Sequence, residues 1–180
     1  LSKKISEVII LTSKNNSDNP IIEICKSKKI KFYRGSLNNV ARRFYEVIKM
    51  KKTESFMRIC GDSPLIDHNL IDKAISKFDV KKYDILTNIF PRSYPKGQSI
   101  EIINSKIFQK IFLLFKNKNN KEHVTTYFYE NFKKFKIYKL KNDINQSNIN
   151  LSIDTPGINL SKISTALGPC KAIKDKSKSK

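Results

Sequence analysis

Two aspartates each follow a short apolar run, at the place where a strand of an α/β protein would end. Asp62 stands after residues 55–60 and Gly61, and Asp154 stands after residues 149–153. The carboxyl ends of parallel strands line the ligand crevice of an open α/β sheet, so both carboxylates are expected at that edge. Mg²⁺ takes one or two protein carboxylates together with phosphate oxygens and water. The two aspartates therefore predict a magnesium site for a phosphorylated ligand.

Asp62 on its own admits a simpler role. Aspartate often accepts hydrogen bonds that fix a turn or begin a helix, and Ser63 and Pro64 follow Asp62 directly. The second strand-end aspartate, Asp154, gives the metal hypothesis its weight, because two carboxylates could share one cation.

Alternating strand and helix patterns would position the two aspartates. Short apolar runs predict strands at residues 7–12, 30–33, 55–60 and 83–88, and helical spacing predicts helices at residues 20–29, 40–48 and 67–78. This alternation is typical of an α/β protein with a mostly parallel sheet between two helical layers. The remaining expected elements are a strand at 99–103, a helix at 104–115, a polar break at 117–121, a helix at 122–132, an extended segment at 135–140 and a strand at 149–153.

Composition and charge narrow the class of protein. With 180 residues and 39% apolar content, the chain can form one domain with a hydrophobic core, and no apolar run is long enough to span a membrane. The net charge of +20 suggests a nucleic-acid partner, but only five of the 36 basic residues are arginine, and the excess of Lys, Ile and Asn fits AT-rich codons. Nucleic acid is therefore not expected. Three widely spaced cysteines indicate a reducing, cytoplasmic location.

Several short motifs, in their order along the chain, carry a resemblance to a known family. They are Arg34-Gly35-Ser36, the block Arg58 to Asp67, Pro91-Arg92-x-Tyr94-Pro95-x-Gly97, Glu122-His123-Val124-Thr125 and Asp154-Thr155-Pro156. Over residues 5–160 the sequence resembles the cytidylyltransferases of the spore-coat polysaccharide type, which are related to the acylneuraminate and 3-deoxy-manno-octulosonate cytidylyltransferases.

The resemblance implies a three-layer nucleotide-diphospho-sugar transferase fold. In that family an oxygen of an acidic or phosphorylated sugar attacks the α-phosphate of CTP, pyrophosphate leaves, and Mg²⁺ is required. Asp62 and Asp154 would be the catalytic, metal-binding carboxylates. A homodimer is a further expectation from relatives. The residues that the resemblance places toward the substrates are Arg58, Gly61, Arg92, Lys96, Gly97, Glu101, Glu122 and His123.

Some of these residues keep a structural alternative. Arg92 could be a surface cation beside a turn, or its planar guanidinium could hold a sugar carboxylate or phosphate. His123 could cap or pack at the start of a helix, or act as a general acid or base. Glu101 could be structural on a hairpin strand.

The chain also departs from the family pattern. The family opens with a strand and an arginine- and glycine-bearing loop that hold the nucleotide, and this sequence begins after that segment. Residues 1–163 are therefore expected to form a domain without the first strand and phosphate loop, with weak or no activity, and residues 164–180 to form a basic, mobile tail. The usual Asp-Gly-Leu-Asp stretch reads Lys96-Gly97-Gln98-Ser99.

Two other classes of protein fit parts of the pattern. A nonenzymatic basic α/β module could hold an anionic sugar, a nucleotide or RNA through its Lys and Arg side chains, and its affinity would fall steeply with salt. A glycosyltransferase of similar architecture is disfavoured, because the sequence contains no Asp-x-Asp metal motif.

Overall fold

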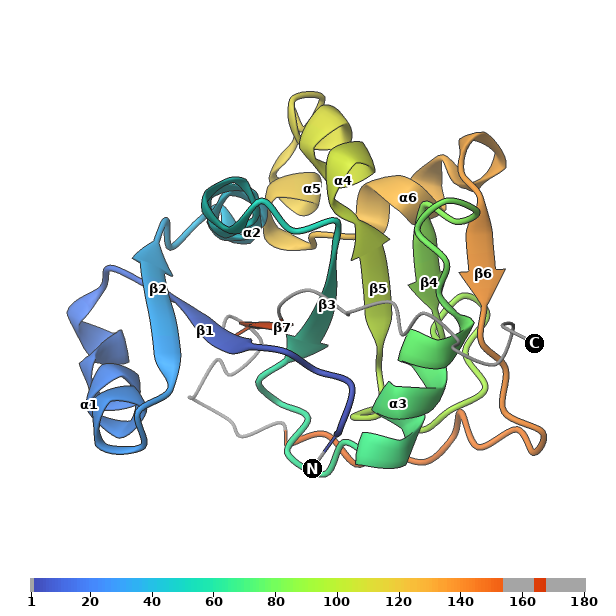
Figure 1. Cartoon of the computed structure of the whole chain (residues 1–180), viewed down its shortest axis with the longest axis horizontal. Helices are drawn as coiled ribbons and strands as arrows, with labels where there is room; N and C mark the ends of the chain where they lie inside the picture. Colours follow the sequence, from blue (N-terminus) through green and yellow to red (C-terminus); the bar gives the residue numbers. More distant parts are fainter. Residues whose placement is uncertain (1, 154–163, 168–180) are drawn as a thin grey trace, which may run out of the picture.

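The computed structural model describes residues 2–153 and 164–167. In this part of the chain, seven strands form one sheet in the order β2-β1-β7-β3-β5-β4-β6 (Figure 1). Five strands run in one direction, whereas β5 and β7 run against them, so the sheet is mixed: β1–β2 and β4–β6 pair in parallel, and the pairs made by β5 and β7 are antiparallel. The strands are β1 (Val8–Ser13), β2 (Lys31–Gly35), β3 (Ser55–Cys60), β4 (Ile85–Thr87), β5 (Glu101–Asn104), β6 (Ile137–Lys139) and β7 (Ser164–Leu167).

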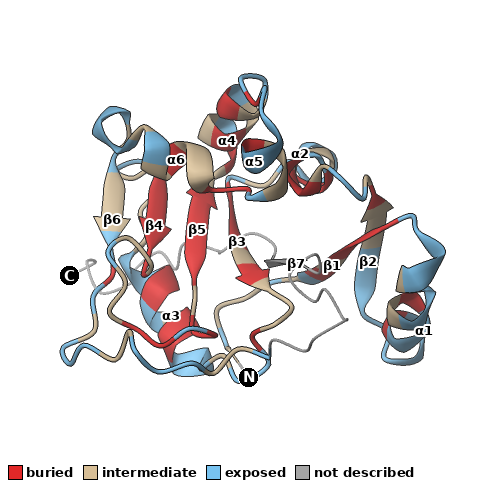
Figure 2. Ribbon diagram, turned by 180° about the vertical axis from the view of Figure 1, so that it is seen from behind, coloured by how far each residue is buried: buried red, intermediate tan, exposed pale blue. Residues whose placement is uncertain are grey.

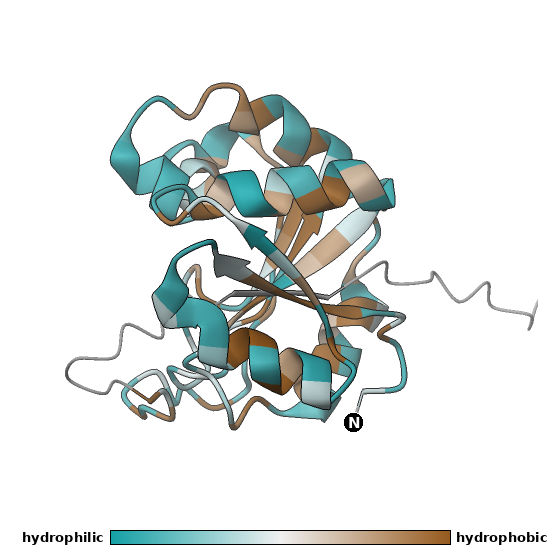
Figure 3. Ribbon diagram, turned by 90° about the vertical axis from the view of Figure 1, so that its left-hand side faces the viewer, coloured by the Kyte–Doolittle hydropathy of each residue, from teal (hydrophilic) through white to brown (hydrophobic). Residues whose placement is uncertain are grey.

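Helices cover both faces of the sheet. The helices are α1 (Asn19–Ser27), α2 (Val40–Lys51), α3 (His68–Lys77), α4 (Ser105–Phe112), α5 (Lys118–Glu122) and α6 (Thr126–Glu130), with short 3-10 helices at Asn16–Asp18 and Phe132–Lys134. Figure 3 shows the sheet between two helical layers: α2, α4, α5 and α6 lie on one face and α1 and α3 on the other. The three-layer α/β architecture predicted from the sequence is thereby confirmed.

Each face of the sheet has its own apolar core. On the α2 face the rings of Phe44 and Phe56 lie 5.6 Å apart between centroids, and those of Phe56 and Phe108 lie 5.2 Å apart. On the α3 face Met57 and Ile102 pack against that helix. Figure 2 shows β4 and β5 as deeply buried, whereas β2 and β6 at the sheet edges are more exposed. None of the described helices is long and apolar enough to cross a membrane.

The strand β7 corrects the expectation of a tail that starts at residue 164. Residues 164–167 pair antiparallel with β1 on one side and with β3 on the other, so they form a strand in the middle of the sheet. The backbone N–H and C=O groups of β1 and β3 that face each other thereby gain partners, which is the physical reason for a strand here. Residues 168–180 lie outside the described part of the chain.

Three other expectations about elements are wrong. The polar break at 117–121 is the helix α5, because the side chain of Asn117 accepts the Asn120 N–H at 2.7 Å and caps the helix start. His123 follows the end of α5 and so does not begin a helix. Residues 149–153 make one isolated bridge, between Asn150 and Lys96, and no strand.

Candidate active site

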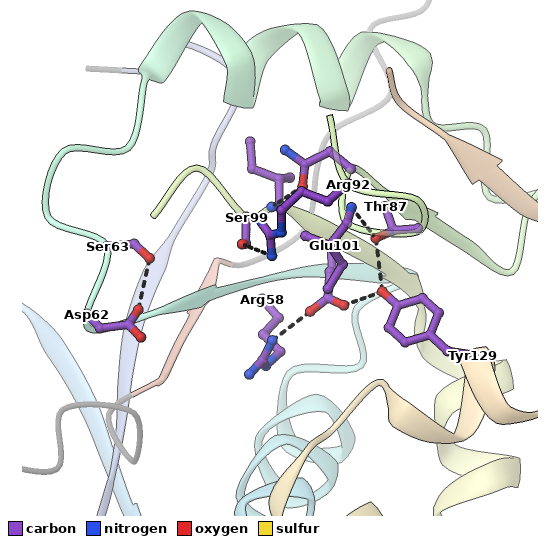
Figure 4. Close-up of polar contacts among 11 residues, drawn as sticks. Arg58, Asp62, Ser63, Thr87, Arg92, Ser99, Glu101 and Tyr129 are labelled. Carbon is purple, nitrogen blue, oxygen red and sulfur yellow. Dashed lines mark hydrogen bonds and ion pairs between the residues drawn. The ribbon is translucent and has the colours of Figure 1, made fainter. Parts of the chain in front are cut away.

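Asp62 lies just beyond the carboxyl end of β3, as the sequence predicts. The chain turns there, and the backbone N–H of Ser63 donates to the carbonyl of Cys60 at 3.3 Å. The Ser63 hydroxyl donates to Asp62 Oδ1 at 2.9 Å (Figure 4). Among the described residues no side chain or backbone group contacts the other carboxylate oxygen of Asp62. Asp62 therefore presents, just beyond a strand end, a carboxylate oxygen for which the described residues provide no hydrogen bond.

The segment that leads to Asp154 is bonded to the same turn. The backbone N–H of Ile153 donates to the carbonyl oxygen of Asp62 at 2.9 Å. Asp154 itself lies outside the described residues. Ile153, the residue before Asp154 in the sequence, is thus in direct backbone contact with Asp62, although the two are 91 positions apart.

A buried cluster of polar side chains lies on the α2 face of the sheet, between β3, β4, β5 and α6. Arg58 Nη1 donates to Glu101 Oε2 at 2.6 Å, and the hydroxyl of Tyr129 donates to Glu101 Oε1 (Figure 4). The Tyr129 hydroxyl also lies 2.9 Å from Thr87 Oγ1. Glu101 is only 1% exposed, so it has lost nearly all contact with water. We call these four residues the Arg58 cluster.

The protonation states in the Arg58 cluster follow from burial and charge. Burial opposes the charged guanidinium, but the neighbouring Cys60 and Glu101 outweigh it and raise the pKa of Arg58, which stays positive. Burial, with the adjacent Glu101 carboxylate, raises the pKa of Tyr129 well above its ordinary value, so the phenol stays a donor. The Arg58 Nε atom is buried and has no hydrogen-bond partner among the described residues. Arg58 is therefore a charged donor whose capacity is only partly used.

Arg92 lies in the irregular segment between β4 and β5. Its Nη1 donates to the carbonyl of Pro95 at 3.3 Å and its Nη2 to the hydroxyl of Ser99 at 3.1 Å (Figure 4). Both acceptors are neutral, so no described carboxylate compensates the charge of this half-buried guanidinium. Lys96 is exposed, and Gly97 beside it is buried.

Glu122 and His123 lie apart from these groups in the described contacts. They close α5, where the N–H of His123 donates to the carbonyl of Asn119 at 2.7 Å and the carbonyl of His123 accepts from Thr126 at 3.0 Å. No described hydrogen bond or ion pair joins either side chain to Asp62, Arg58 or Arg92.

Two surface pockets occur near this end of the sheet. One, of about 430 Å³, includes Lys73, Tyr94 and Gln98 in its lining, and the other, of about 460 Å³, includes Tyr33 and Arg42. Neither lining contains Asp62 or a member of the Arg58 cluster. The candidate site thus rests on side-chain and backbone contacts.

The sequence patterns do not predict some residues of this region as part of the site. Tyr129 and Thr87 belong to the Arg58 cluster, and Gln98 and Asn88 are buried with both ends of each amide bonded. Thr87 and Asn88 end an otherwise apolar run, which is the one local signal that could have marked them. Tyr129 and Gln98 meet their partners only through the tertiary fold.

Comparisons with known proteins show the family to which the chain belongs. The chain matches the family model described as Cytidylyltransferase over residues 1–163. It is 33% identical over 156 residues to the uncharacterized protein MJ1063 of Methanocaldococcus jannaschii, covering 86% of this chain. It is 29% identical over 128 residues to the spore coat polysaccharide biosynthesis protein SpsF of Bacillus subtilis, covering 69% of this chain. The chain spans 63% and 51% of the lengths of these two relatives.

A solved structure of a cytidylyltransferase from Leptospira borgpetersenii has the same fold. Its TM-score with this chain is 0.79 at 31% sequence identity, and the match covers 82% of this chain and 63% of that one. The resemblance seen in the sequence motifs is thereby confirmed. With a family model matched over 163 of its 180 residues, this chain belongs to the cytidylyltransferase family, whose members are nucleotidyltransferases.

Proposed function

We propose that this chain acts in the transfer of a cytidylyl group from CTP to an acidic or phosphorylated sugar during the synthesis of a surface polysaccharide. The family supports the nucleotide and the reaction type, and the name of the relative SpsF supports the pathway. The observation that carries the proposal is the backbone hydrogen bond from Ile153 to Asp62, since it joins the turn that bears Asp62 to the segment that precedes Asp154.

Asp62 and Asp154 are the proposed holders of Mg²⁺. The Asp62 carboxylate oxygen that has no hydrogen bond among the described residues fits such a role, because Mg²⁺ requires oxygen ligands. Within the described residues there is no group of three or more metal-ligating side chains, so water and phosphate oxygens would complete the coordination. A bound Mg²⁺ would neutralise negative charge on the phosphates during the displacement.

The anionic sugar is proposed to lie toward the two guanidinium groups. Arg92 has only neutral acceptors, so it can add a charge-assisted bond to a carboxylate or phosphate, and the Arg58 side chain, which is 14% exposed, adds a second positive charge. Glu101 and Tyr129 hold the Arg58 guanidinium in place. Gly61 precedes Asp62 directly, and the backbone of Lys96 and Gly97 contacts the segment before Asp154. Glu122 and His123 have no role in this proposal.

Partners and location complete the proposal. A homodimer is proposed only from the oligomeric state expected for the family. A cytoplasmic location is proposed because Cys25 and Cys60 are free thiols, which suit a reducing compartment.

Calorimetric titration with CTP, with and without Mg²⁺, tests the proposed function. We expect Mg²⁺-dependent binding that disappears in the Asp62→Ala, Asp154→Ala double variant. The matched control is Asp143→Ala, which removes an exposed carboxylate without a described contact. A CTP affinity that is the same with and without Mg²⁺, and the same in the double variant, would overturn the proposal. RNA binding that weakens steeply with salt, unchanged in the double variant, would favour the nonenzymatic basic module.

A further inference from the structure

The loop of residues 94–98 contacts both segments that carry the aspartates. Its Lys96 backbone brackets the segment before Asp154: the N–H donates to the carbonyl of Ile149 at 2.9 Å and the C=O accepts from Leu151 at 2.9 Å. The side chain of Gln98 holds the turn after Asp62: Nε2 donates to the carbonyl of Leu65 at 2.6 Å and Oε1 accepts the N–H of Asp67 at 2.9 Å. One loop therefore holds the two segments together.

Gly97 makes the close approach of this loop to residues 151–152 feasible. Its φ is +84°, a backbone conformation that other residues adopt rarely. A Cβ at this position would lie 2.6 Å from the carbonyl carbon of Leu151 and 2.7 Å from the backbone nitrogen of Ser152. Both atoms are backbone and cannot move aside as a flexible side chain could. Any side chain at residue 97 must therefore push the segment before Asp154 away.

The loop is itself fixed to the centre of the fold. The fully buried Asn88, which follows β4, donates from Nδ2 to the carbonyl of Gln98 at 2.6 Å and accepts the N–H of Ile100 at 2.8 Å. The N–H of Gln98 donates to the carbonyl of Pro95 at 3.1 Å. Positions taken by Gly97 and Gln98 are thus set by the sheet.

We propose that residues 94–98 form a positioning clamp that holds the turn after Asp62 against residues 149–153, the segment that precedes Asp154, with Gly97 and Gln98 as its positioning residues. This role rests on the proposed function, because the separation of the two aspartates matters only if they share a ligand. A carboxylate pair binds one cation only within a narrow range of separations. A small shift of the segment before Asp154 should therefore lower the affinity for the cation, even where it leaves the hydrophobic core intact.

Amide hydrogen exchange tests the clamp without any ligand. In Gly97→Ala we expect the amides of Leu151 and Ile153 to exchange about tenfold faster, the effect of losing one hydrogen bond. In Gln98→Ala the Asp67 amide should exchange faster instead. Asn148→Ala, at an exposed position of the same surface segment, is the control that should change none of these amides. Unchanged exchange at Ile153 in Gly97→Ala and at Asp67 in Gln98→Ala would overturn the clamp.

Titration with Mn²⁺ in the presence of CTP, followed by electron paramagnetic resonance, tests the positioning role. Mn²⁺ accepts the oxygen ligands that suit Mg²⁺. We expect both variants to weaken Mn²⁺ binding at least several-fold at a temperature where each is fully folded, and Gln98→Glu, which keeps the acceptor for Asp67, to lose less than Gln98→Ala. Lower melting temperatures with Mn²⁺ affinity equal to that of Asn148→Ala would mean a merely structural loop and overturn the positioning role.

The two hypotheses fail in different ways. An unaltered chain that binds no Mn²⁺ with CTP contradicts the proposed function, while the exchange measurement still decides whether residues 94–98 tie the two segments together. Should Gly97→Ala not fold, Gln98→Ala carries both measurements, because it removes a side chain without adding an overlap.

Discussion

The guanidinium of Arg58 and the carboxylate of Glu101 form an ion pair of 2.6 Å between the neighbouring strands β3 and β5, almost closed off from water. Removing one partner of a buried pair leaves the other charge without compensation, which costs far more than the pair itself contributes. The pair therefore makes the interior of the sheet sensitive to single substitutions at either residue.

Glu101→Gln should lower the free energy of unfolding by about 3 kcal/mol, because it leaves the Arg58 charge uncompensated while preserving the shape of the side chain. Urea unfolding followed by circular dichroism measures this. The control is Glu23→Gln in the exposed pair with Lys26, which should change the free energy by less than about 0.5 kcal/mol. Equal effects of the two substitutions would mean that the Arg58–Glu101 pair behaves as a surface pair.

Tyr129→Phe should cost about 1–3 kcal/mol of folding free energy, since Glu101 Oε1 and Thr87 Oγ1 lose their partner in a buried site. The same urea titration applies. Tyr138→Phe is a matched control, because its ring contacts Tyr83 and no described hydrogen bond uses its hydroxyl. A loss no larger than that of the control would show that the Tyr129 hydroxyl does not stabilise the cluster.

Tyr33 should make stability fall with rising pH in the alkaline range. Its hydroxyl donates to Glu46 at 2.6 Å, and this bond, with burial and the Glu46 charge, raises the pKa of Tyr33 to about 12. A raised pKa in the folded state gives stability that is complete below the unfolded value of 10.0 and is lost as the pH rises through the folded value. Unfolding between pH 9 and pH 12 should thus show a slope that Tyr33→Phe reduces, and an unchanged slope would contradict the assignment.

Asp18 should make stability fall with falling pH in the acidic range. Burial alone would raise its pKa, but hydrogen bonds from Ser13 and Thr12 outweigh burial and lower the pKa of Asp18. A lowered pKa in the folded state gives stability that is present above the unfolded value of 3.8 and is lost as the pH falls through the folded value. Asp18→Asn should therefore destabilise the protein at pH 7 and much less at pH 2, as measured by thermal melts at both pH values. A pH-independent difference would contradict this.

Local patterns in the sequence predicted most of the elements but fewer of the contacts. Residues 55–60 form β3 as expected, because a short apolar run between polar residues is a strong strand signal, and Asp62 follows from it. The strand at residues 164–167 was missed because its partners, residues 8–11 and 57–60, are distant in the sequence and no local pattern encodes such pairing. Helix α5 was missed because its polar composition hid the cap at Asn117.

In the candidate site too, local patterns place some residues but not the contacts between them. Asp62 could be placed at a strand end from the sequence, and Glu101 on a strand. That Arg58 pairs with Glu101, or that Gln98 bonds to the turn at residues 65–67, depends on which strands and loops are neighbours in space. The sequence alone could name such residues only through a family pattern, and Gln98 lies where this chain departs from that pattern.

The position of β7 has a consequence for how the protein is made. β1 and β2 are synthesised early, as is β3, yet β1 and β3 are joined in the sheet by residues 164–167. On the ribosome the facing edges of β1 and β3 stay unpaired until residues 164–167 have been translated, and exposed strand edges of this kind invite pairing with other chains. Nascent chains of this protein should therefore depend on chaperones that shield strand edges until translation passes residue 167.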